Sequence, residues 1–162
     1  MIYAVIDTNV LVSALITHNP EAAMAKVVRL LFNHGFVPMY DADIIAEYEE
    51  VLHRDKFPIL PDAADALISY IIENGVEASR ADFAESMPDE DDRVFYEVSL
   101  SNEDSFLVTG NLKHYPISPR IITPAAFIDF ISEKEESESD ASGEHSIFAK
   151  KNENENREGR YQ

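Results

Sequence analysis

The chain has 162 residues, of which 45% are apolar, and its formal net charge is −18. This length and composition predict one globular domain with a sizeable core. The sequence contains no cysteine, which excludes disulfides and thiolate metal sites and suits a reducing cytoplasm. No apolar run approaches the roughly 20 residues of a membrane span, and the N-terminal residues lack the pattern of a signal peptide. We therefore expect a cytoplasmic protein without a membrane segment.

The acidic charge belongs mainly to the part of the chain that is expected to fold. Residues 133–162 hold nine acidic and five basic side chains, so the first 132 residues carry a net charge of −14. Such a surface repels nucleic acid in general and argues against a high-affinity DNA-binding protein that reads sequence. It does not exclude a nuclease in which a metal ion bridges the phosphate to carboxylates.

Short apolar runs and helix signals alternate along the first half of the chain. Asn19 and Pro20 suit the N-cap and first position of a helix, and Asp41 suits another N-cap. Pro38 is unusual inside a strand. In chain order the pattern predicts a strand at 3–6, helices at 10–16 and 20–34, a strand at 36–40, and helices at 42–52 and 61–74.

The second half continues the alternation after a polar, acidic loop at 85–92. The pattern there predicts a helix at 93–100, strands at 105–109 and 120–123, and a helix that begins at Pro124. Strands that alternate with helices indicate parallel βαβ units with helices on both faces of the sheet. The predicted fold class is therefore α/β.

The composition changes at residue 133. Ser, Glu, Asn, Lys and Gly dominate residues 133–162, and apolar residues nearly vanish. Such a segment buries too little apolar surface to offset the entropy of ordering. The predicted organisation is a domain over 1–132 and a disordered acidic and polar tail over 133–162.

Four polar side chains are placed where a parallel α/β sheet binds ligands, beyond the carboxyl ends of its strands. Asp7 directly follows the first predicted strand, and Asn111 follows the strand at 105–109 after a short turn. Glu47 lies in the helix after the second strand, and Asp92 begins a helix. Mg²⁺ prefers oxygen ligands of this kind, and a bound metal ion promotes phosphodiester hydrolysis. The constellation predicts a metal site.

Each residue also has a simpler interpretation. Asp7 and Asp92 are placed as helix N-caps, Glu47 as a solvated helix residue, and Asn111 as a turn residue. The neighbouring acids at 89 and 91 are alternatives to Asp92. Lys113 and His114 follow Asn111 and are placed to approach a phosphate, while Arg54 reads as an ordinary helix-surface residue.

Four segments resemble, in order and spacing, the acidic motifs of PIN-domain proteins. These segments are Ile6–Leu11, Glu47–Leu52, Asp89–Ser99 and Leu107–Pro116. The resemblance covers about residues 1–132 and is closest to the branch assigned as toxin components of toxin–antitoxin systems. It implies a three-layer α/β/α fold with a central parallel sheet of four to five strands.

The same resemblance implies an activity and a set of site residues. It implies an endoribonuclease that depends on Mg²⁺ or Mn²⁺ and cuts single-stranded RNA, a partner antitoxin, and a homodimer. By position, the metal and catalytic residues are Asp7, Glu47, Asp92 and Asn111. Many relatives have Asp where this chain has Asn111, so the site holds one charge less. Asp92 is preferred over its acidic neighbours because Phe95 and Ser99 then fall on one helix face.

Two further functional classes compete with a ribonuclease. One is a catalytically weak binding module that keeps the fold, which the acidic balance and Asn111 favour. The other is a 5′-nuclease acting on DNA structures, whose relatives bring further acids and a DNA-binding extension. A dinucleotide-binding enzyme is disfavoured because no Gly-x-Gly-x-x-Gly motif follows the first strand.

Overall fold

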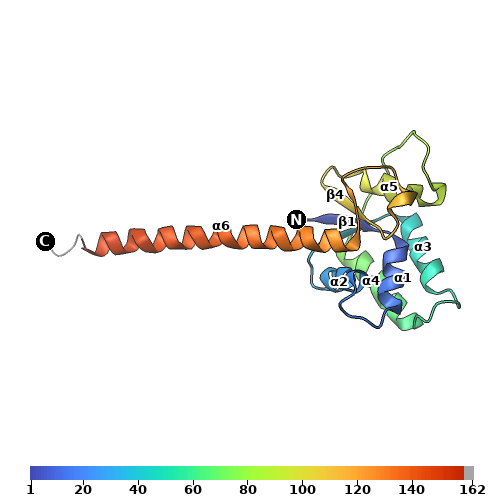
Figure 1. Cartoon of the computed structure of the whole chain (residues 1–162), viewed down its shortest axis with the longest axis horizontal. Helices are drawn as coiled ribbons and strands as arrows, with labels where there is room; N and C mark the ends of the chain where they lie inside the picture. The colour runs from blue at the N-terminus through green and yellow to red at the C-terminus, as the bar shows by residue number, and fades with distance from the viewer. Residues whose placement is uncertain (159–162) are drawn as a thin grey trace. The chain divides into compact units, whose positions relative to one another are not determined.

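The computed structural model describes residues 1–158, with side chains described for residues 1–142. Its centre is a five-stranded sheet in which all strands are parallel and the order is β3-β2-β1-β4-β5. Figure 1 labels β1 and β4, two neighbouring strands of this sheet. The strands are β1 Tyr3–Ile6, β2 Val37–Tyr40, β3 Val76–Glu77, β4 Ser105–Val108 and β5 Ile121–Ile122. The prediction of an α/β fold with a central parallel sheet of four to five strands is confirmed.

The helices follow the predicted order, with two short 3-10 turns added. They are α1 Thr8–Ile16, α2 Ala23–Phe32, α3 Ala42–Leu52, α4 Pro61–Asn74, η1 Glu90–Asp92, α5 Arg93–Ser99, η2 Leu112–His114 and α6 Pro124–Glu158. The predicted N-cap role of Asp41 is confirmed, because its carboxylate accepts a hydrogen bond of 2.8 Å from the amide of Ile44. The two-residue strand β3 and the turn η2 were not predicted, since segments this short carry no hydrophobic period.

The prediction that α2 begins after Asn19 is wrong by a few residues. The N-cap of α2 is Ala22, and the Asn19 side chain instead accepts a hydrogen bond of 3.0 Å from the amide of Glu21. The Asn19 carbonyl also accepts from the amide of Ala22, which closes a turn before the helix begins. Local Asx-turn bonding therefore competes with helix capping at this position.

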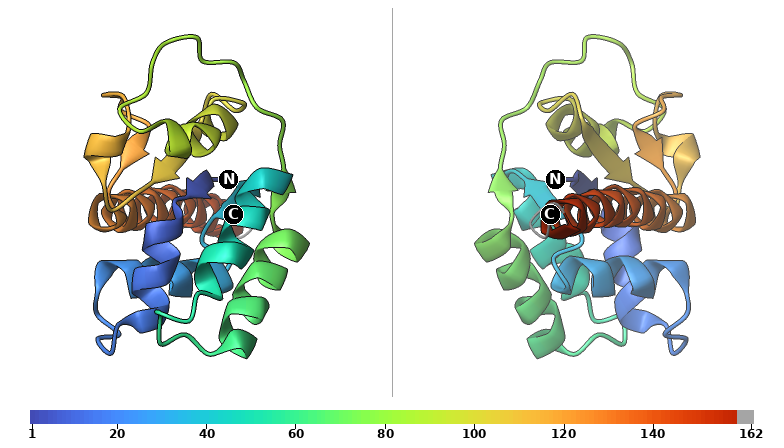
Figure 2. Two further views of the ribbon diagram at one scale, coloured as in Figure 1. Left: turned by 90° about the vertical axis from the view of Figure 1, so that its right-hand side faces the viewer. Right: turned by 90° about the vertical axis from the view of Figure 1, so that its left-hand side faces the viewer.

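Helices cover both faces of the sheet. The short helix α5 packs on β1, β2 and β4, whereas α1 and α2 lie on the other side of these strands (Figure 2). The core between the layers is apolar, and its fully buried side chains include Val5, Leu11, Ile44, Phe95 and Leu107. This burial is the main contribution to the stability of the domain.

The central strand pair positions the carboxyl ends on which the site is built. In β1 and β4, Ile6 is the register partner of Val108. The pairing continues for one residue beyond β1, because the amide of Asp7 donates a hydrogen bond of 2.9 Å to the carbonyl of Val108. Asp7 and Thr109 therefore leave the sheet side by side.

The chain divides into two compact units, residues Met1–Ile128 and residues Asp129–Gln162. The division into a domain over 1–132 and a tail over 133–162 stays a prediction. The second unit continues α6, and every side chain from 132 to 142 is exposed. None of the described helices is both long enough and apolar enough to cross a membrane. The disorder of residues 133–162 stays a prediction, and residues 159–162 lie outside the described part.

Removing residues 135–162 is expected to leave the free energy of unfolding within about 0.5 kcal/mol of the full chain, because exposed side chains contribute little. The described side chains of this segment, at residues 135–142, are exposed. A helix that lacks tertiary packing is marginal in water. Thermal melts of the full and shortened chains provide the comparison. A fall in Tm of several degrees would show that the deleted segment makes stabilising contacts.

Candidate functional site

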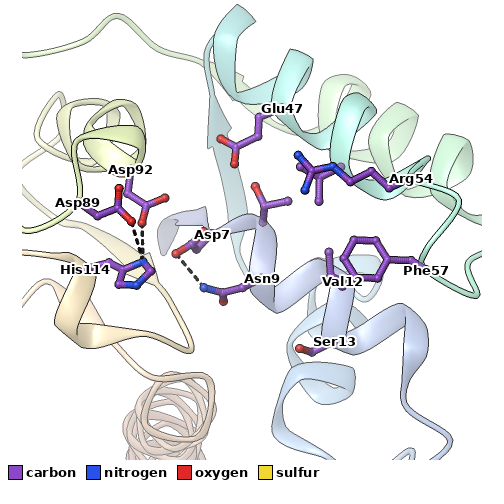
Figure 3. Close-up of a pocket in the computed structure, with 12 residues that line it drawn as sticks. Asp7, Asn9, Val12, Ser13, Glu47, Arg54, Phe57, Asp89, Asp92 and His114 are labelled. Carbon is purple, nitrogen blue, oxygen red and sulfur yellow. Dashed lines mark hydrogen bonds and ion pairs between the residues drawn. The ribbon is translucent and has the colours of Figure 1, made fainter.

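A pocket of about 370 Å³ opens at the carboxyl ends of β1 and β4. One side of it is acidic and the other is apolar with a single arginine (Figure 3). The acidic side contains Asp7, Glu47, Asp89, Asp92 and His114, and the opposite side contains Val12, Ser13, Val51, Arg54 and Phe57. Thr8 and Asn9, at the start of α1, lie between the two sides.

Asp7 is held rigidly at the end of β1, and its side chain is only 4% exposed. Its Oδ2 atom accepts hydrogen bonds from Asn9 Nδ2 at 3.1 Å, Thr109 Oγ1 at 2.8 Å and Tyr115 Oη at 2.9 Å. All three side-chain hydrogen bonds end on Oδ2, so Oδ1 receives none of them. Asp7 is the N-cap residue of α1, yet its side chain makes no capping hydrogen bond. The structure therefore does not support a mere capping role.

The protonation behaviour of Asp7 and Tyr115 fits this arrangement. Burial raises the pKa of Asp7 above its ordinary value, and the hydrogen bonds from Thr109 and Tyr115 offset part of that rise. Burial and the charge of Asp7 raise the pKa of the Tyr115 hydroxyl far above its ordinary value. Tyr115 therefore remains a hydrogen-bond donor to Asp7 at any physiological pH.

Thr8 is buried beside Asp7 at the start of α1. Among the described side chains, its Oγ1 is the buried polar atom that has no hydrogen-bond partner. This hydroxyl lies near enough to the Glu47 carboxylate to lower its pKa slightly, but not in hydrogen-bond geometry. Buried polar groups are nearly always satisfied, so an unpaired hydroxyl between two carboxylates fits a site that takes up an ion or water.

Glu47 reaches the pocket from α3, as Figure 3 shows. The neighbouring Tyr48 is fully buried and donates a hydrogen bond to the carbonyl of Ile6, which ties α3 to the end of β1 next to Asp7. Burial and the negative charges of Asp7 and Asp92 raise the pKa of Glu47 to about 7. The prediction that α3 delivers an acid to the strand ends agrees with this placement.

Asp92 faces the same pocket from η1. Burial and the charge of Asp7 raise the pKa of Asp92 to about 6, and the hydrogen bond with His114 offsets part of this rise. Asp92 is the N-cap residue of α5 but makes no capping hydrogen bond, whereas Asp89 accepts one from the amide of Asp91 at 3.1 Å. Asp89 lines the pocket together with Asp92, and Asp91 does not. Of the alternatives to Asp92, the structure brings only Asp89 to the site.

His114 connects two of the predicted site residues. Its Nδ1 lies 2.8 Å from Asp92 Oδ2 and 3.4 Å from Asp89 Oδ2, and its Nε2 lies 2.7 Å from Asn111 Nδ2. His114 therefore bridges the Asp92 carboxylate and the Asn111 amide through its two ring nitrogens. Asn111 does not line the pocket itself, so in this structure its amide reaches the site only through His114.

Arg93 holds the loop that carries Asp89 and Asp92. Its guanidinium donates to the carbonyls of Phe83 and Glu85 at 2.6 and 2.8 Å, and to the Glu90 carboxylate at 2.7 Å. It also lies 5.8 Å from the centre of the Phe83 ring. One side chain thus connects the irregular segment before η1 to α5 and limits its freedom near the pocket.

The donor set fits a divalent metal ion. Asp89, Asp92 and His114 each offer one ligand atom, and these atoms lie within 4.8 Å of one another. Asp7 and Glu47 line the same pocket, and burial raises the pKa of both carboxyl groups. Carboxylate oxygens suit Mg²⁺ and Mn²⁺, and an imidazole is better suited to Mn²⁺ than to Mg²⁺.

The comparison with known families agrees with this geometry. The profile of a family described as PIN domain matches residues 3–113, a segment that contains every acidic residue of the pocket. PIN domains are generally nucleases that use a divalent metal ion and act on nucleic acid. Among the curated proteins and the solved structures, none is similar enough to the chain to count as a match. Because the family match spans more than half of the chain, the protein belongs to the PIN-domain family.

Proposed function

We propose that this protein is a metal-dependent endoribonuclease that cuts single-stranded RNA. The observation that carries the proposal is the convergence of Asp7, Glu47 and Asp92 from three separate elements on one pocket. Burial raises the pKa of all three carboxyl groups, and the charges of neighbouring acids add to the rise for Glu47 and Asp92. A fold that gathers unfavourable negative charge in this way is suited to bind a cation there.

Asp7, Glu47 and Asp92 are the residues that would hold Mg²⁺ or Mn²⁺. When bound, a divalent ion lowers the pKa of water and stabilises the charge that develops on a phosphate during hydrolysis. Asn9, Thr109 and Tyr115 orient the Asp7 carboxylate through Oδ2. These fixed donors hold it in one orientation before the substrate arrives, which avoids reorganisation during the reaction.

Asn111 is the fourth proposed member of the site. Its amide contacts His114, and His114 contacts Asp92, so Asn111 acts on the carboxylates through the imidazole in this geometry. This contact uses Nδ2 of Asn111, whereas direct ligation of a metal ion would use Oδ1. An amide at this position adds no negative charge to the pocket.

The preference for RNA and the role of a toxin rest on the resemblance of the four motifs to the toxin branch. On that basis the protein acts in the cytoplasm on single-stranded RNA as a homodimer, and a protein antitoxin inhibits it. Induced expression of the chain alone is then expected to arrest growth. Co-expression of the antitoxin is expected to restore growth.

The direct test is cleavage of an end-labelled single-stranded RNA by the purified protein with Mn²⁺, with Mg²⁺ and with EDTA. Cleavage with either metal ion and none with EDTA is expected. Duplex RNA and single-stranded DNA of the same sequence serve as substrate controls. If the protein binds RNA but cuts none of these substrates with either ion, the nuclease proposal fails and a catalytically weak binding module takes its place.

A further inference from the structure

The side of the pocket opposite the carboxylates is built by the turn that follows α3. The amide of Arg54 donates to the carbonyl of Val51 at 3.2 Å, and the amide of Phe57 donates to the carbonyl of Arg54 at 3.0 Å. These two bonds fold the chain back on itself, so that Arg54 and Phe57 both line the pocket. Pro58 follows and favours an extended conformation at Phe57. Figure 3 shows the Phe57 ring away from the carboxylates, whereas the Arg54 guanidinium lies nearer to Glu47.

The side of the pocket that we call the wall is formed by Val12, Ser13, Val51, Arg54 and Phe57. Arg54 supplies its positive charge. Among the described residues that line the pocket, it is the only lysine or arginine. The Glu50 carboxylate receives hydrogen bonds from Arg54 Nε at 3.0 Å and from Nη2 at 2.7 Å, which fixes the plane of the guanidinium. The Nη1 atom makes no hydrogen bond to a described residue, and the side chain is 43% exposed. An oriented guanidinium with free donors suits recognition of a phosphate.

Phe57 supplies an aromatic surface next to that charge. Its side chain is partly exposed, and Val12 and Val51 line the pocket beside it. The ammonium of Lys56 lies 5.0 Å from the centre of the Phe57 ring, so a second cation is close to this surface. An adjacent pocket of about 330 Å³ shares Val12 and Ser13 with the first, so the hollow surface continues along α1.

The negative net charge of the molecule opposes the binding of a polyanionic substrate, so a substrate strand needs favourable local contacts. The chain carries a formal charge of −18, and the acidic side of the pocket repels phosphate when no cation is bound. A nucleic acid strand therefore requires local attraction that does not depend on net charge. Aromatic rings that stack on bases and arginines that contact phosphates provide it, and this combination is typical of single-strand binding sites.

We propose that Arg54 and Phe57 bind the nucleotide next to the scissile phosphate, with its base stacked on Phe57 and its phosphate paired with Arg54. This inference rests on the proposed nuclease function and assigns the substrate-binding wall of the same site. It makes the enzyme selective for single strands, because a base inside a duplex does not expose its face for stacking. Glu50 is a positioning residue that acts through Arg54.

The experiment compares steady-state cleavage of a single-stranded RNA by the wild type and by Phe57→Ala, Phe57→Leu and Phe57→Trp. Loss of one stacked base is expected to raise KM about tenfold in the alanine and leucine variants, with kcat unchanged within about twofold. Tryptophan is expected to restore KM, whereas leucine retains apolar volume but has no aromatic face. Arg54→Gln is expected to raise KM. It is also expected to lower by about one the slope of log KM against the logarithm of the salt concentration, because one phosphate contact is lost. Phe32→Ala and Arg29→Gln, which alter exposed residues outside the pocket, are the matched controls.

A second substrate series isolates the base. RNAs with one abasic ribose at each position around the mapped cut are expected to include one that the wild type binds about tenfold more weakly. Phe57→Ala should not distinguish that RNA from the intact one. The proposal is overturned if KM does not change in Phe57→Ala, if Phe57→Leu behaves as wild type, or if every abasic RNA affects wild type and variant equally.

Failure of the nuclease proposal is distinguishable from failure of this one. If the wild type cuts no RNA, the same RNAs are used in fluorescence anisotropy with Mn²⁺ present. One result is that Phe57→Ala binds the intact RNA more weakly than the wild type and binds the abasic RNA no more weakly than the intact one. This result would support base stacking on Phe57 in a protein that binds RNA but does not cut it. Equal binding by wild type and Phe57→Ala, or no binding by either, would overturn it.

Discussion

Replacement of Asp7 by Asn is expected to lower metal-dependent RNA cleavage by about three orders of magnitude while the protein remains folded. A metal ion stabilises the transition state by several kcal/mol, and each 1.4 kcal/mol corresponds to a factor of ten. The variant amide oxygen is still able to accept the hydrogen bonds from Asn9, Thr109 and Tyr115. Loss of a buried charge whose pKa is raised should also increase Tm in EDTA.

The effect of Asp7→Asn on Tm distinguishes a metal-binding role of Asp7 from a helix-capping role. If Asp7 only capped α1, its replacement would lower stability by about 1 kcal/mol, with or without metal. Asp91→Asn is the matched control, because Asp91 lies in η1 but outside the pocket. Asp92→Asn should behave as Asp7→Asn does. Wild-type cleavage rates in the purified Asp7→Asn protein would remove this residue from the catalytic centre.

The metal-free protein is expected to lose stability as the pH rises from about 4.5 to 7. The pKa of Glu47 is raised to about 7 and that of Asp92 to about 6, so the folded state binds more protons than the unfolded chain in this window. Stability therefore falls with increasing pH. With allowance for solvent screening of these half-buried groups, the loss is on the order of 2 kcal/mol, or roughly 5 °C in Tm.

Thermal melts in EDTA between pH 5 and 8 measure this effect, and Glu47→Gln is expected to flatten the curve. His53 also has a raised pKa and contributes in the same direction, so the comparison with Glu47→Gln is needed to assign the effect. Saturating Mn²⁺ should stabilise the wild type by about 2.7 kcal/mol at a hundredfold excess over Kd. The gain should be larger at pH 8 than at pH 5, because protons compete with the metal ion. A wild-type Tm that rises with pH in EDTA would contradict the convergence of charges.

Much of the fold was predictable from local pattern. The strands β1 and β4 are short apolar runs that polar residues end, and the start of α4 is marked by Pro61 and its end by Gly75. The two-residue strand β3 carried no such signal, because only its pairing with β2 defines it. The N-cap at Asn19 failed because a local turn satisfied the same side chain.

The site was predictable to the extent that strand ends and motif order define it. Asp7, Glu47 and Asp92 do meet in one pocket. The contact between Asp92 and His114 spans 22 residues of sequence and joins two irregular segments, so no periodicity reveals it. Arg54 and Phe57 gave no sequence signal either, since the turn after α3 alone directs them toward the pocket.

The position of α3 connects the two sides of the pocket. Glu47 and Val51 lie on α3, and Arg54 lies in the turn directly after it, so one helix and its C-terminal turn contribute to both sides of the pocket. The Tyr48 hydroxyl bonded to the Ile6 carbonyl is the pivot of that helix. A small rotation about this pivot would displace ion ligand and base platform together. Under the proposed roles of Glu47 and Phe57, affinity for the ion and selectivity for single-stranded RNA would therefore change together.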